Sequence, residues 1–97
     1  MPERASYYSN RAAAWFMVGA LAECVADCRE ALKRDPTHVR ANLRMAKALV
    51  DLGEIDQACK ALRHAASTIP DSKEIAQELR AITELDDALT KARAALE

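Results

Sequence analysis

Two arginines, Arg40 and Arg44, are spaced one helical turn apart in the segment VRANLRMAKAL. At this spacing both side chains leave a helix on the same face. A guanidinium group offers a rigid fork of N–H donors whose geometry matches a carboxylate. Upstream, the segment SNRAAAWF places another polar residue, Asn10, in an alanine-rich run that is expected to be buried. These residue types are suited to binding an oxyanion.

Cysteine and histidine residues raise the question of metal binding or catalysis. Cys24 and Cys28 are four residues apart, so they share one helix face. A structural zinc site needs four ligands, and Cys59, His38 and His64 lie on different predicted elements without paired spacing. Neither histidine is accompanied by a carboxylate and a nucleophile in a catalytic arrangement. We therefore predict buried packing thiols, no metal, no cofactor and no enzymatic activity.

Composition indicates a single all-helical domain. The chain has 97 residues, which is barely enough for a self-sufficient core. Hydrophobic residues make up 51% but aromatic residues only 4%, a mixture that suits closely packed helices. Two glycines and three prolines allow few turns, and no stretch alternates apolar and polar residues as a half-buried strand would.

Charge and cysteine content point to the cytoplasm, with the nucleus also compatible. The 14 basic and 15 acidic residues nearly cancel, so no general attraction to nucleic acid or to a membrane surface is expected. Apolar runs are far shorter than a membrane span, and the first residues, MPERAS, do not resemble a secretory signal. An odd number of cysteines without framework spacing favours a reducing compartment. The sequence does not show whether Met1 is the native start.

The sequence repeats with a period of 34 residues. Shifted by this length, Asn10 falls on Arg44, and within each unit a helical pattern runs to a glycine, a second follows, and a proline ends the unit. We predict helices over about 4–18, 21–34, 37–51 and 55–68. The coinciding small and turn-forming residues are Ala12 with Ala46, Gly19 with Gly53, Ala31 with Ala65, and Pro36 with Pro70; Trp15, Leu21, Val25, Leu49, Ile55 and Leu62 are expected to fill the space between helices.

This pattern resembles the tetratricopeptide repeat family. The resemblance implies antiparallel helix-turn-helix repeats over 5–38 and 39–72, stacked in a right-handed superhelix, with a capping helix over 73–97. Residues 1–97 would then form one domain, complete in itself or part of a longer protein. A pentatricopeptide RNA-binding array is the near alternative, but its period is typically one residue longer and its chains tend to be basic.

The last segment departs from the repeat and predicts one long amphipathic helix over about 72–96. Its first half can cover the open face of the second repeat. Its second half would then be frayed, be covered by a following domain, or mediate self-association through Leu85, Leu89 and Leu96. Its apolar positions are Ile75, Leu79, Ile82, Leu85, Leu89, Ala92 and Leu96.

More narrowly, YYSNRAA followed one unit later by RANLR resembles the carboxylate-clamp domains of co-chaperones. These domains bind the acidic C-terminal Glu-Glu-Val-Asp tail of heat-shock chaperones. The resemblance implies that Asn10 bonds the terminal carboxylate, that Arg40 and Arg44 hold acidic groups, and that Ala13 and Phe16 contact the apolar part of the tail. The function expected is therefore that of a protein interaction module in a chaperone adaptor.

Several alternatives remain open. Clamp domains usually have three repeats, of which the first supplies a lysine and an asparagine, and this chain begins where the second would begin. Arg40 and Arg44 could be solvated helix charges, and Asn10 could be a packing residue. A scaffold segment that self-associates, or a groove that binds an internal peptide without a free carboxylate, would fit the same sequence.

Overall fold

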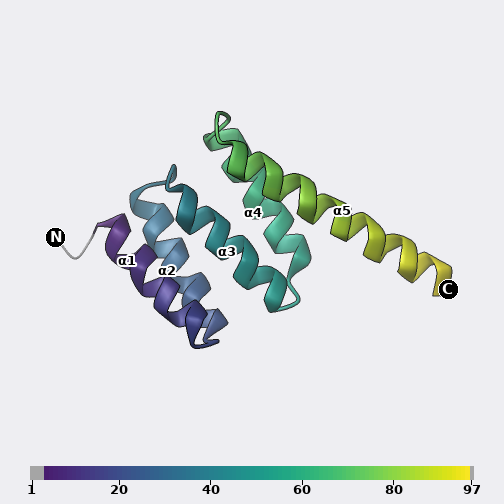
Figure 1. Cartoon of the computed structure of the whole chain (residues 1–97), viewed down its shortest axis with the longest axis horizontal. Coiled ribbons are helices and arrows are strands. Elements are labelled where there is room, and N and C mark those ends of the chain that lie inside the picture. Colours follow the sequence, from purple (N-terminus) through teal and green to yellow (C-terminus); the bar gives the residue numbers. More distant parts are fainter. Residues whose placement is uncertain (1–3, 97) are drawn as a thin grey trace.

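The computed structural model describes residues 4–96, and this part of the chain forms five helices and no strand (Figure 1). Each observed helix agrees with a predicted one to within two residues at either end. No described helix has the length and the apolar character needed to cross a lipid bilayer. The helices are α1 (Ala5–Met17), α2 (Leu21–Arg34), α3 (Val39–Asp51), α4 (Ile55–Thr68) and α5 (Lys73–Leu96).

Successive helices pack side by side as antiparallel neighbours. Beyond these neighbours, α1 contacts α3, and α3 contacts α5. The odd-numbered helices therefore form one layer of the array, and α2 and α4 form the other (Figure 1). This arrangement confirms the predicted helical repeats and creates a face made only from α1, α3 and α5.

Small side chains allow the two layers to approach closely. Ala12, Ala31, Ala46 and Ala65 are all buried, as the repeat pattern predicts. A methyl side chain at a helix crossing brings the axes together and leaves room for larger neighbours. Among these neighbours, Leu62 is fully buried.

The two helix-turn-helix corners share one backbone device. Gly19 and Gly53 have φ angles of +82° and +84°, a left-handed conformation that side chains other than glycine disfavour. The Gly19 N–H donates to the Phe16 carbonyl, and the Gly53 N–H donates to the Val50 carbonyl, at N–O distances of 3.1 and 2.9 Å. Each bond ends the preceding helix and redirects the chain into the next one.

The start of α3 is held by its own capping network. The imidazole Nδ1 of His38 accepts a hydrogen bond from the Ala41 N–H, and the buried Asn42 amide donates to the carbonyls of Pro36 and His38. Because His38 is the capping residue, α3 begins at Val39, two residues later than predicted. The network fixes the first turn of α3, which carries Arg40.

A buried carboxylate joins α1 to α2. Asp27 Oδ2 accepts hydrogen bonds from Arg11 Nε at 2.6 Å and from Trp15 Nε1 at 2.9 Å, and Oδ1 accepts from Arg11 Nη2 at 2.8 Å. The Asp27 side chain is only 7% exposed. Hydrogen bonds from Arg11, helped by its charge and by the Trp15 N–H, lower the pKa of Asp27 more than burial raises it.

Trp15 corrects one prediction. We expected it to fill the space between helices, but it is 37% exposed. An indole N–H requires a hydrogen-bond acceptor when it packs against the protein, and Asp27 supplies one at the edge of the α1–α2 pair. The hydrogen bond from Trp15 Nε1 to Asp27 therefore keeps the indole ring at this edge, where it stays partly exposed.

We expect Asp27→Asn to lower the free energy of unfolding at pH 7 by about 1–3 kcal/mol, since it weakens hydrogen bonds to a buried carboxylate. Urea denaturation followed by the fluorescence of Trp15, the single tryptophan, measures the change. The pKa of Asp27 is lower in the folded chain than its ordinary value of 3.8, so its stabilising effect is complete above that pH and is lost as pH falls through the folded value. The difference between the wild type and Asp27→Asn should therefore shrink in acid; an equal difference at pH 7 and pH 2 would contradict the ionic role.

We expect Gly53→Ala to destabilise the fold by about 1–2 kcal/mol, because the new side chain must adopt a left-handed backbone conformation. An added Cβ at Gly53 would meet no atom within 4 Å, so the loss is a backbone effect. Gly53→Asn is the control, since asparagine tolerates this conformation better and should cost less. Thermal unfolding by circular dichroism ranks the three proteins, and equal losses for the two variants would argue against this explanation.

Candidate functional site

A cationic pocket of about 300 Å³ opens on the face formed by α1, α3 and α5. One wall is Phe16 of α1. The other is a stripe of α3 that carries Arg40, Arg44 and Lys47. The lining residues are Phe16, Arg40, Leu43, Arg44 and Lys47.

The charges of the cationic pocket are uncompensated. Arg40, Arg44 and Lys47 form no ion pair or hydrogen bond through their side chains within residues 4–96, and no acidic side chain lines the pocket. They stand at i, i+4 and i+7 of α3, so they project from one face. Three neighbouring like charges repel one another, and a bound anion with several oxygen atoms would relieve this repulsion.

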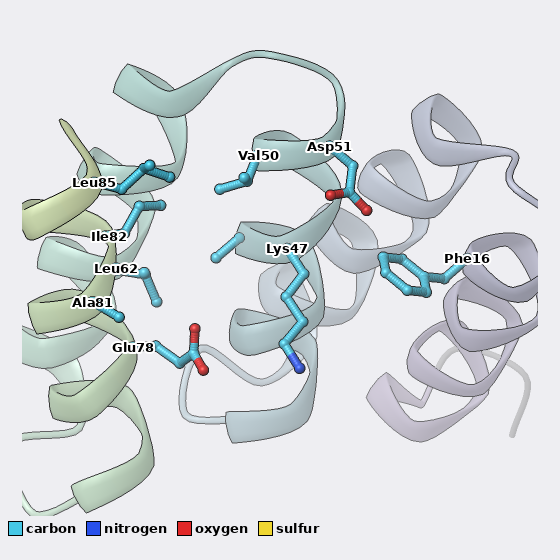
Figure 2. Close-up of a pocket in the computed structure, with 10 residues that line it drawn as sticks. Phe16, Lys47, Val50, Asp51, Leu62, Glu78, Ala81, Ile82 and Leu85 are labelled. Atoms are coloured by element: carbon cyan, nitrogen blue, oxygen red, sulfur yellow. The ribbon is translucent and has the colours of Figure 1, made fainter. Parts of the chain in front are cut away.

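An apolar pocket of about 270 Å³ adjoins the cationic pocket between α3 and α5. Phe16 and Lys47 line both pockets, so the two lie side by side on this face, and together they are called the groove. Figure 2 shows Val50, Ile82 and Leu85 turned toward the middle of the apolar pocket. The lining residues are Phe16, Ala46, Lys47, Val50, Asp51, Leu62, Glu78, Ala81, Ile82 and Leu85.

The structure brings together three of the five residues that the sequence proposed for peptide binding. Phe16, Arg40 and Arg44 line the cationic pocket. On α1, Ala13 lies one turn before Phe16 and Asn10 lies about two turns before it. Asn10 is exposed, Ala13 is partly buried, and neither lines the two pockets. The pocket is thus built mainly from α3.

The three leucines considered for self-association have separate surroundings. Leu85 lines the apolar pocket, and Leu89 lines a small cavity beside the α3–α4 turn. Leu96 is 88% exposed. Self-association through these leucines stays a prediction.

Other groove residues were not singled out as site residues from the sequence. Lys47 could have been found, since it follows Arg44 by three residues and shares its helix face. Asp51 also lies on this stripe, one turn beyond Lys47. In contrast, Glu78 and Ile82 reach the groove only because α5 crosses α3, which no local pattern encodes.

The cysteines are packing residues. Cys24, Cys28 and Cys59 are buried and carry free thiols. Burial raises the pKa of Cys28 to about 12, so its thiol stays protonated at neutral pH. Within residues 4–96, no cluster of three or more histidine, cysteine, aspartate or glutamate side chains has the arrangement of a metal site.

Comparison with known proteins gives three informative similarities. Human DnaJ homolog subfamily C member 7 is 33% identical over 79 residues, which are 81% of this chain and 16% of the relative. The structure of the Hsp90 co-chaperone Cns1 from Saccharomyces cerevisiae superposes with a TM-score of 0.84 at 29% identity, covering 95% of this chain and 30% of that one. The first TPR of Spaghetti (RPAP3), bound to the HSP90 peptide SRMEEVD, superposes with a TM-score of 0.73 at 26% identity, covering 87% and 68%.

The chain therefore spans only a small part of the curated relative to which it is similar. A tetratricopeptide repeat model matches residues 16–82, which is more than half of the chain. This match includes the second helix of the first repeat, the whole second repeat and the first part of α5. It agrees with the 34-residue period and with the two glycine corners. The chain belongs to the tetratricopeptide repeat family.

Proposed function

We propose that this chain is a non-enzymatic binding module for the acidic C-terminal tail of a heat-shock chaperone, and that it serves a co-chaperone or adaptor in the cytoplasm. One observation carries the proposal. Arg40, Arg44 and Lys47, which form no side-chain ion pair or hydrogen bond within residues 4–96, line a pocket that adjoins an apolar one. An extended acidic peptide with an apolar residue fits both halves of such a groove.

The cationic pocket would hold the end of the tail. Arg40 and Arg44 present planar donor forks to the terminal carboxylate and to acidic side chains, and Lys47 adds a third charge. Asn10, exposed on α1, would donate its amide N–H to the terminal carboxylate from the opposite side. Ala13 and Phe16 would supply apolar contact.

The comparisons support this choice of ligand. A tetratricopeptide domain of similar structure is bound to a peptide that ends in Glu-Glu-Val-Asp, and another structural neighbour is an Hsp90 co-chaperone. Both superpose on this chain at identities of 26–29%. The proposal needs no group that performs covalent chemistry, since its ligand is held by hydrogen bonds and packing alone.

We expect the peptide SRMEEVD with a free C-terminus to bind, and Arg44→Ala to weaken binding about 10- to 100-fold, because hydrogen bonds to charged groups contribute about 1.5–3 kcal/mol. Amidation of the peptide C-terminus should cause a loss of similar size, since it removes the terminal charge. Isothermal titration calorimetry at low ionic strength gives the dissociation constants.

Arg63→Ala is the matched control, because Arg63 is an exposed arginine of α4 that lines neither pocket. It should leave the affinity unchanged. Equal affinity for the free and amidated peptides would show that the groove binds internal peptides. Equal losses in Arg44→Ala and Arg63→Ala would show that net charge alone attracts the peptide.

A further inference from the structure

The charge lining the groove changes sign along its length. The cationic pocket contains three basic side chains and no acid, whereas the apolar pocket contains two carboxylates, Asp51 and Glu78, beside the shared Lys47. Neither carboxylate forms a hydrogen bond or an ion pair in the part of the chain that the structure describes. Figure 2 shows them on different sides of the apolar pocket, Glu78 on α5 and Asp51 on α3.

Glu78 is partly buried, which makes its lack of a partner significant. Removing a carboxylate from water has a free-energy cost unless a cation or a hydrogen-bond donor compensates it. By contrast, the buried Asp27 carboxylate receives three hydrogen bonds. Glu78 therefore lies where a ligand could supply the missing positive charge.

The spacing of the charged residues on α3 indicates which residue of a bound peptide would carry that positive charge. Arg40, Arg44, Lys47 and Asp51 occupy i, i+4, i+7 and i+11, so they lie along one face. With a rise of 1.5 Å per residue, Arg40 and Asp51 are separated by about 16 Å along the helix axis. An extended peptide covers this length in about five residues. A tail whose last residue binds at Arg40 thus places its sixth residue from the end near Asp51, and the fifth over the apolar pocket.

We propose that Asp51 and Glu78 select acidic tails that carry a basic side chain immediately before the apolar residue, at the sixth position from the C-terminus. This inference rests on the proposed function and specifies its ligand further. A basic side chain there pairs with the two carboxylates, a neutral one leaves them without a partner, and an acidic one is repelled. The peptide SRMEEVD has this order of groups, since its arginine is sixth from the end and precedes methionine.

The test compares SRMEEVD with STMEEVD, in which threonine replaces only that arginine. We expect the wild type to prefer the arginine peptide by about two- to fivefold at low salt, the range for partly exposed ion pairs. Asp51→Asn and Glu78→Gln should each reduce this preference. The double variant should abolish it without lowering the affinity for STMEEVD, because that peptide offers no positive side chain to the two carboxylates. Added salt should also weaken the preference.

Glu84→Gln is the control, because Glu84 is an exposed acid of α5 that lines neither pocket. It should keep the full preference. Helical circular dichroism and Trp15 fluorescence verify that each variant is folded.

The outcomes separate this inference from the proposed function. If both peptides bind equally and in a carboxylate-dependent manner, the selection by Asp51 and Glu78 is overturned and the chaperone-tail function stands. If the double variant binds both peptides more weakly by the same factor, Asp51 and Glu78 maintain the structure of the groove and do not discriminate the sixth residue. The inference is again overturned. If neither peptide binds at high concentration, the proposed function is wrong and the inference fails with it.

Discussion

The close approach of helices at buried alanines is the constraint on which the rest of this structure depends. Ala12 and Ala46 occupy equivalent positions in the first helices of the two repeats, and Ala31 and Ala65 do so in the second helices. A larger side chain at any of these positions would separate the two layers. The groove exists because this spacing keeps α1, α3 and α5 in one layer, with their outer faces free to bind.

Charged groups of the chain are used in two different ways. Where a charge supports the fold, it is paired: Asp27 receives three hydrogen bonds and fixes α1 against α2. In the groove, Arg40 and Arg44 form no side-chain ion pair or hydrogen bond within residues 4–96, so their N–H donors are available to a ligand. The fold therefore does not depend on the groove charges, and a site of this kind can change its charges without loss of the helical array.

The architecture could be predicted from the sequence because a few residues recur at a fixed period. Gly53 repeats the turn of Gly19, so the ends of the helices follow from backbone conformation that only glycine adopts readily.

Prediction of the site was less complete. Arg40 and Arg44 belong to one helix, so their common direction follows from local spacing. The far wall of the groove does not, because the crossing of α5 over α3 depends on the packing of the whole array. Leu85 illustrates the limit: its spacing predicted a contact with a second copy, and only the packing of α5 on α3 shows that it also lines the apolar pocket. Trp15 shows that size alone did not predict burial, since its N–H determined its position.

Phe16 belongs to the walls of both pockets, and this has a thermodynamic consequence. A ring that packs against the acidic end of a ligand also borders the space for its apolar residue. Contributions from the two halves of a ligand are then coupled through one side chain, and they are not expected to add. In the proposed complex the groove would act as one site with two chemically different ends, so a fragment that fills one end would not report the energy that this end contributes to the whole ligand.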